Sequence, residues 1–161
     1  MPFQDKDNGY KKLVQSVYKL GAVPRIEVGV LSGKADEMHV TEGGTRQVTV
    51  LDVAIWNEFG TKKIPERSFI RAWFDENEEK ARTAVRRLLS SVVSGKREAK
   101  DVANILGTTF VAQIQKRMAS GIAPENAEET IERKGSSKPL IDTGQLRSSI
   151  TFRVVDGKRA T

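Results

Sequence analysis

Apolar residues recur three and four positions apart in several stretches of the chain, the spacing of one face of a helix. A first stretch spans residues 7–20, and two longer ones span residues 73–92 and 99–118. Gly95 and Gly121 follow the longer stretches and are typical helix stops. The pattern predicts a helix near the N-terminus and two long helices in the middle of the chain.

Two short stretches alternate polar and apolar residues, as strands do when one face is buried. These are residues 25–30 and residues 150–155. Residues 32–46 have no periodicity and are expected to form a mobile hairpin loop or arm, leading to a further strand near 47–50. The chain is therefore predicted to be one α+β domain, residues 1–161, with a small antiparallel sheet packed against two long helices and extended loops.

A short helix is expected to begin at Thr49, because Asp52 stands three residues later as in a capping box. The helical pattern ends at Gly60, which is expected to be a left-handed cap, and Pro65 fixes the backbone of the connection that follows. We interpret this connection as a rigid corner between the sheet and the next helix. Its candidate residues are Glu58, Phe59, Gly60, Pro65, Arg67, Phe69 and Arg71.

The C-terminal third contains an extended segment, residues 122–140, in which Pro124 is expected to open a short helix. A turn motif follows, made of Asp142, Thr143, Gly144, Leu146 and Arg147. Asp-Thr-Gly is also the signature of aspartic proteases, but those enzymes need two carboxylates that share a proton. We favour the interpretation in which Asp142 or Thr143 caps a short helical turn.

Composition narrows the possible chemistry. The chain has 161 residues, no Cys and one His, which excludes disulfides, thiolate metal sites and zinc sites built on a pair of His side chains. The acidic cluster 75–79 is expected to be a solvated helix turn, because consecutive helical residues diverge. No stretch has the apolar length of a membrane span or of a secretory signal. We expect no cofactor, no membrane contact and synthesis in a cytoplasm.

The net charge of +6 makes a polyanion a possible partner. Arg82, Arg86 and Arg87 lie on one predicted helix, where Glu78 and Glu79 neutralise part of the face. No aromatic side chain is interleaved for stacking on bases. A DNA-binding protein that uses this helix is the alternative to the interpretation that follows.

Two segments together resemble a known family. The first is AIWNEFGT (54–61) followed by IPERSFIR (64–71), and the second is TIERKGSSKPLIDTGQLRSSI (130–150). Their order and spacing are similar to those of the neck or tail-completion proteins of tailed bacteriophages, the head-to-tail joining and virion morphogenesis families. The likeness covers about residues 25–155. Asn57 stands where relatives often have His, and Ser68 where many have a second Pro.

The resemblance implies a non-enzymatic virion protein that forms a homo-oligomeric ring, sixfold or twelvefold, in the neck or tail. Its implied partners are neighbouring neck, connector and tail-tube proteins, and DNA in the lumen would be contacted without sequence specificity. The loop 32–46 and the segment 122–140 are the expected arms between subunits. Their candidate interface residues are Lys34, Met38, His39, Lys134 and Lys138.

Overall fold

The computed structural model describes residues 24–41, 44–125, 132 and 144–156. The helix predicted at 7–20 and the candidate interface residues Lys134 and Lys138 lie outside this part of the chain, as does most of the segment 122–140. The described elements, in chain order, are β1 (Arg25–Val30), β2 (Met38–Thr41), β3 (Gly44–Thr49), α2 (Val50–Phe59), α3 (Arg71–Val93), α4 (Ala99–Ser120), α6 (Gln145–Ser149) and β4 (Ile150–Val155).

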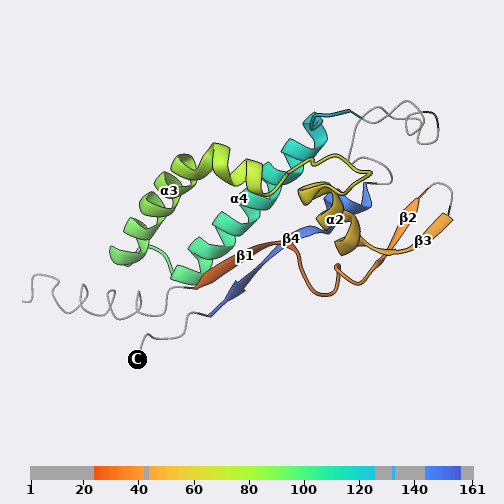
Figure 1. Ribbon diagram of the computed structural model, residues 1–161. Helices are drawn as coiled ribbons and strands as arrows, with labels where there is room; N and C mark the ends of the chain where they lie inside the picture. The colour runs from red at the N-terminus through yellow and green to blue at the C-terminus, as the bar shows by residue number, and fades with distance from the viewer. Residues whose placement is uncertain (1–23, 42–43, 126–131, 133–143, 157–161) are drawn as a thin grey trace, which may run out of the picture.

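The two strands predicted from alternation pair with each other, although they lie at opposite ends of the described chain. β1 and β4 run antiparallel, in a register that places Arg25 opposite Val155 and Val30 opposite Ile150. Helix α4 packs on this pair, and α3 packs on α4 (Figure 1). The predicted class, an α+β fold with a small antiparallel sheet and two long helices, is confirmed.

The contact between α4 and the sheet is close at Gly107. A Cβ atom on Gly107 would lie 2.2 Å from the ring of Phe152 in β4. Such a distance is far inside van der Waals contact, so a side chain at this position would push the helix away from the strand. Gly107 therefore sets how near α4 lies to β4.

The expectation for residues 32–46 needs correction, because two strands fall within or overlap this range. β2 and β3 form an antiparallel hairpin with an irregular register between Met38 and Val40. The hairpin extends away from the helices (Figure 1) and pairs with neither β1 nor β4. The sequence of this range has no regular alternation, so the hairpin could not be predicted from the pattern of apolar residues.

The larger core lies where α2, the corner, α4 and α6 meet. Its side chains come from segments far apart in the sequence, which is what one cooperative domain requires. The buried members are Val50, Ala54, Phe69, Trp73, Ile114, Met118, Leu146 and Ile150. A smaller cluster of Val92, Val102 and Leu106 closes the far end of the α3–α4 pair.

The short helix α2 begins as the sequence predicted. Thr49 accepts a hydrogen bond from the Asp52 amide, and the Asp52 carboxylate accepts one from the Thr49 amide, which is a complete capping box. α2 ends at Gly60, where φ is +72° and ψ is 172°. The φ is positive as expected, but the conformation is not the left-handed helical cap.

Across the described residues, no helix combines the length and the apolar character that a membrane crossing needs.

Candidate functional site

The centre of the corner is the carboxylate of Glu58, in the last turn of α2. Its side chain is only 7% exposed. It accepts hydrogen bonds from the amides of Phe69 (2.9 Å), Ile70 (3.1 Å) and Arg71 (2.9 Å), and from the Ser68 hydroxyl (2.7 Å). The first amides of a helix have no partner within the helix, and the helix dipole favours a negative charge beside them. Glu58 therefore caps α3 from outside that helix.

The side chain of Arg71 forms a second link between the two helices, from α3 back to α2. Its Nη2 donates to the main-chain carbonyl of Glu58 (2.7 Å) and to the carboxylate of Glu66 (2.7 Å). The guanidinium carbon lies 4.5 Å from the centroid of the Phe59 ring, a cation–π arrangement. Arg71 thus holds the last turn of α2 while its own amide is held by Glu58.

The hydrogen bonds around Glu58 also set its protonation. Burial by itself raises the pKa of this carboxyl group, because it disfavours the charged form. The hydrogen bonds from Arg71, Phe69 and Ser68 favour the charged form and together outweigh burial. The pKa of Glu58 is therefore lowered, and the side chain is an anion at neutral pH.

The loop between α2 and α3 is tightly folded. The Thr61 amide donates to the Ile64 carbonyl (2.7 Å), and the Thr61 hydroxyl accepts from the amides of Lys63 (3.2 Å) and Ile64 (2.9 Å). A Cβ on Gly60 would lie 2.9 Å from the Glu66 amide nitrogen, so only glycine fits. Pro65 lies exposed within this loop.

The side chain of Arg67 bonds to the segment that follows α4. It is 7% exposed. Its Nε donates to the Pro124 carbonyl (2.7 Å) and its Nη2 to the Glu125 carbonyl (2.9 Å). Its main-chain amide donates to the Asn57 carbonyl (2.7 Å), and burial lowers the pKa of its guanidinium. Arg67 therefore ties the corner to the segment that leaves α4.

The turn motif near the C-terminus meets the corner in the core. Phe69 is fully buried in one cluster with Leu146 and Ile150. The Gln115 side chain of α4 donates to the carbonyls of Arg147 (3.1 Å) and Ile150 (3.2 Å), which fixes α6 against α4. The Arg147 side chain itself is exposed.

The two residues predicted to cap this turn are not among the described residues. The residue that precedes α6 is Gly144, in a left-handed conformation with φ +74° and ψ 1°. Glycine adopts this conformation without a steric penalty and has no side-chain oxygen to offer. Asp142 and Thr143 lie outside the described residues.

The three candidate interface residues in the range 32–46 differ in how far they are exposed to solvent. Lys34 is exposed and pairs with Glu37 (2.7 Å), and Met38 is 44% exposed. His39 is only 8% exposed, so it is not available as the contact residue that the sequence suggested. A buried position in the hairpin could not be inferred from a stretch that lacked periodicity.

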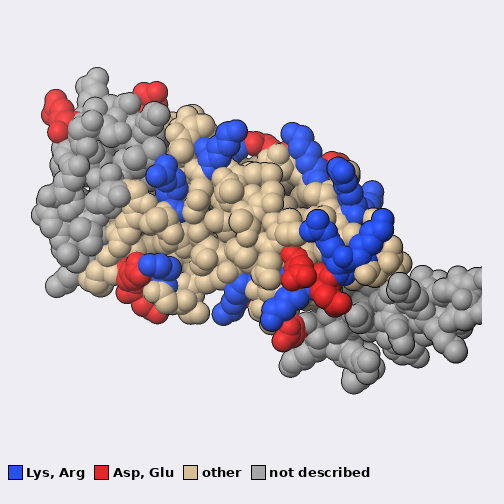
Figure 2. All heavy atoms as spheres, turned by 180° about the vertical axis from the view of Figure 1, so that it is seen from behind, with Lys and Arg blue, Asp and Glu red and all other residues tan. Residues whose placement is uncertain are grey.

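The basic residues of α3 gather toward one end of the molecule. Figure 2 shows Lys and Arg on the end formed by the α3–α4 hairpin, with a few acidic side chains among them. Arg82 is paired with Glu78 (2.7 Å), as the spacing predicted, and this pair raises the pKa of Arg82. Arg86 and Arg87 are exposed.

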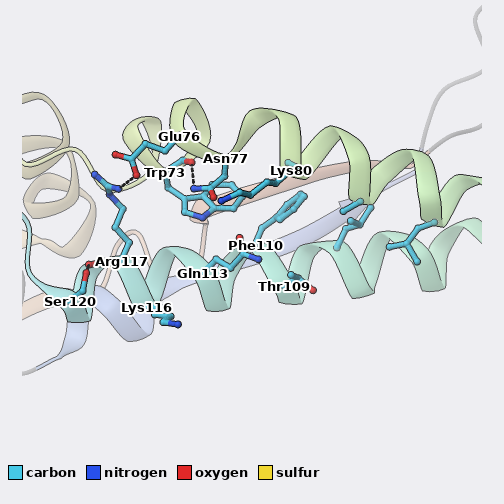
Figure 3. A pocket seen from close by; sticks show the side chains of 14 residues that line it. Trp73, Glu76, Asn77, Lys80, Thr109, Phe110, Gln113, Lys116, Arg117 and Ser120 are labelled. Carbon is cyan, nitrogen blue, oxygen red and sulfur yellow. Dashed lines mark hydrogen bonds and ion pairs between the residues drawn. The ribbon is translucent and has the colours of Figure 1, made fainter.

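An open groove of about 610 Å³ lies between α3 and α4. Trp73 and Phe110 meet at its base with ring centroids 5.2 Å apart (Figure 3). Glu76 and Arg117 form an ion pair across one end, and Gln113 lies along the α4 side. The sequence pattern placed these residues on two helices, but it could not show that a hollow separates them.

Exposed apolar side chains are the second feature that the sequence did not reveal. Leu51, Ile55 and Phe59 follow one another at four-residue spacing on α2 and are 37%, 45% and 59% exposed. Phe74, near the start of α3, is 51% exposed, while its neighbour Trp73 is buried. One face of α2 therefore presents a stripe of large apolar groups to solvent.

The described residues contain no group of three or more acidic or His side chains placed to hold a metal ion. Neither a protein-family model, nor a curated protein, nor a solved structure matches the chain.

Proposed function

We propose that this chain is a structural protein of a tailed bacteriophage, without enzymatic activity, that assembles as a ring at the junction between head and tail. There it completes the tail or joins it to the head connector. The proposal starts from the likeness of its two sequence segments to neck and tail-completion proteins. It gains support from the way the fold uses the residues that carry the likeness.

The observation that carries the proposal is the shared core of the two segments. Phe69, from the first segment, is buried together with Leu146 and Ile150, from the second. Residues that are far apart in the chain and resemble one family therefore act as one structural unit. Chance similarity in either segment alone would not require the two to be packed together.

The polar groups of the corner are engaged in holding the fold. The Glu58 carboxylate accepts from three amides and a hydroxyl, and the Arg71 guanidinium bonds to Glu58 and Glu66. A catalytic acid or base has to exchange a proton with a substrate. These groups instead fix the angle between two helices, which suits a subunit that must present a constant shape to its neighbours.

Labelling of virions tests the proposal. The chain is produced in infected cells with a gold-binding tag at its C-terminus, and the particles are viewed by electron microscopy. Label at the junction between head and tail is the expected result. Particles that lack the polypeptide, or label on the capsid shell or the tail tip, would contradict the proposal.

A DNA-binding protein is the second candidate, favoured by the exposed Arg86 and Arg87 on α3. Binding through phosphates would weaken steeply as salt is added, because counterions are released on binding. Titration of duplex DNA from low to high salt, with wild type and with Arg86→Glu/Arg87→Glu, decides this. If DNA binds at low salt and the variant abolishes binding, the second candidate gains; no binding at low salt removes it.

A further inference from the structure

We propose that residues 7–20, which the sequence predicts to be a helix, dock along the groove between α3 and α4 of the same chain. The groove is the open hollow of about 610 Å³ at Trp73 and Phe110 (Figure 3). Its occupant is thus a segment of this chain that precedes the described residues. The docking concerns contacts within one subunit, so it holds whether or not that subunit belongs to a phage neck.

The chain enters the described structure beside one end of the groove. Ile26, near the start of β1, packs on the smaller core cluster, and so does Leu88. That cluster contains Leu106, and both Leu88 and Leu106 line the groove. The six residue steps from Leu20 to Ile26 span up to about 20 Å when extended. Leu20 can therefore lie at the Leu88 end of the groove while Ile26 keeps its place in the core.

This entry point sets the direction of the segment. With Leu20 at the Leu88 end, Asp7 lies toward the Trp73 end, parallel to α3 and antiparallel to α4. A helix over residues 7–20 is about 20 Å long at a rise of 1.5 Å per residue. Along α3 the groove extends from Trp73 to Leu88, about 22 Å by the same rise. The segment therefore matches the groove in length.

The segment has one apolar face and one polar face. At 3.6 residues per turn, its large apolar side chains fall within about 120° of arc. These are Tyr10, Leu13, Val14, Val17 and Leu20. The opposite face carries Lys12, Gln15, Ser16 and Lys19. A helix of this kind buries its apolar face and leaves the lysines in solvent.

The half of the groove nearest the chain entry has no charged lining residue. Its lining residues are Ala81, Ala84, Leu88, Leu106 and Thr109. Placing the apolar face of an amphipathic helix in such a groove is a common mode of recognition between peptide segments and proteins. Release of water from the apolar lining favours the docking.

Helix α4 is depleted of charge along the groove. No charged residue occurs from Val102 to Gln115, although 30% of the whole chain is charged. Thr109 and Gln113 lie in this stretch, line the groove and are exposed in the described structure. Exposure without charge is typical of a surface that another element covers, because burying a charge would be costly.

The charged lining residues of the groove all lie in its other half. Glu76, Lys80, Lys116 and Arg117 line that half, where Glu76 pairs with Arg117 (Figure 3). No ion pair joins Lys80 or Lys116 to any described residue. This end of the groove therefore carries two positive charges that the described residues leave uncompensated.

The beginning of the segment supplies the opposite sign. Asp5, Lys6 and Asp7 together carry a net charge of −1. The direction set by the chain entry places Asp5 and Asp7 near the two lysines of the groove, and Asp7 also offsets the positive end of the segment's own helix dipole. The reverse direction would bring Lys19 to the same lysines. Charge thus favours the direction that the entry point already requires.

Engineered cysteines test the docking in the full-length chain, because the natural chain has none. With Leu20 beside Leu106 and the two helices antiparallel, Val17 lies beside Thr109. Mild oxidation of Val17→Cys/Thr109→Cys is expected to consume both thiols in most chains and to leave a monomer on a non-reducing gel. The matched control is Gln15→Cys/Thr109→Cys, because position 15 lies about 160° around the helix from position 17. The control is expected to keep its thiols reduced under the same conditions.

Two results of this experiment overturn the docking. One is equal linking in the two variants. The other is no linking in Val17→Cys/Thr109→Cys, although both thiols react with a soluble reagent before oxidation. Links between chains, seen as dimers and larger species, overturn the placement of the segment within its own chain and point to a second copy as the occupant of the groove.

The reactivity of a single thiol measures whether the segment covers the groove. In full-length Thr109→Cys, adding Leu13→Asp/Val17→Asp is expected to raise the rate of maleimide labelling several-fold, because charges on the apolar face release the segment. Adding Gln15→Asp/Ser16→Asp introduces the same charge on the polar face and is expected to leave the rate unchanged. Thr108→Cys, outside the groove on α4, is the reference and should react at one rate in all backgrounds.

Equal labelling rates at position 109 in both backgrounds overturn the docking. Failure of these tests leaves the proposed function standing, because label at the junction between head and tail does not depend on where residues 7–20 lie. Conversely, a linked and protected position 109 in a protein absent from virions would keep the docking and remove the proposed function.

Discussion

Glu58 and Arg71 bond to each other's main chain. The Glu58 carboxylate accepts from the Arg71 amide at 2.9 Å, and the Arg71 guanidinium donates to the Glu58 carbonyl at 2.7 Å. The first bond gives a partner to an amide at the beginning of α3, and the second gives a partner to a carbonyl near the end of α2. Because both helix ends are satisfied by this pair, the angle between the helices depends on it, and several consequences can be measured.

Replacing Glu58 by Gln should destabilise the fold by about 2–4 kcal/mol, because a buried acceptor of five hydrogen bonds, one of them from Arg71 Nε (3.3 Å), loses its charge and places an amide group among donors. Urea unfolding of the purified chain measures the loss. Glu66→Gln is the matched control, since Glu66 pairs with Arg71 but is exposed. It should cost less than about 1 kcal/mol. Equal losses in the two variants would contradict the role given to Glu58.

The lowered pKa of Glu58 predicts that the free energy of unfolding depends on pH. The pKa of Glu58 is lowered from its ordinary value of 4.5, so the unfolded state binds its proton at higher pH than the folded state does. Its stabilising contribution is complete above the unfolded pKa and is lost as pH falls through the folded pKa. The difference in unfolding free energy between wild type and Glu58→Gln should be constant near neutrality and should shrink on acidification below 4.5. A difference that widens in acid would contradict this sign.

Gly107→Ala should destabilise the chain, because the added Cβ would lie 2.2 Å from the Phe152 ring. The expected cost is about 1–3 kcal/mol, typical of overpacking at a buried contact. Thr108→Ala, at the next and exposed position of α4, should change stability by less than about 0.5 kcal/mol. Thermal unfolding of both variants measures the effect. A neutral Gly107→Ala would mean that α4 can move off β4 without loss.

Two glycines with positive φ allow the stability cost of backbone strain to be measured apart from the cost of a steric clash. A methyl group on Gly60 (φ +72°) would lie 2.9 Å from the Glu66 amide nitrogen, whereas one on Gly121 (φ +90°) would point into open space. Gly121→Ala should cost about 1–3 kcal/mol from its backbone conformation alone. Gly60→Ala should cost more, by about 1–3 kcal/mol, because the loop must also shift. Urea unfolding of both variants measures the difference, and similar values would indicate that the loop adapts freely.

Local signals in the sequence predicted much of the fold. The capping box of Thr49 and Asp52 and the alternation in residues 25–30 each depend on neighbours within a few positions, so they could be recognised directly. The long apolar stripes located α3 and α4 for the same reason. The overall class followed from the order of these elements.

Relationships across the chain could not be predicted in the same way. The pairing of β1 with β4 depends on a register between distant strands, and the bond from Arg67 to Pro124 depends on where the segment after α4 returns. Glu58 was recognised as part of a corner, but its function as a cap depends on three amides of another helix. The exposure of Phe74 likewise depends on which side of α3 faces solvent.

The pairing of Arg25 with Val155 has a practical consequence. It brings the start of the first described strand and the end of the last one to the same place (Figure 1). A fluorophore attached at position 25 or at position 155 should therefore report nearly the same location within an assembled particle. The described domain should also tolerate circular permutation, with these two strand ends joined by a short linker and new termini opened at Gly95 and Lys96, between the two long helices.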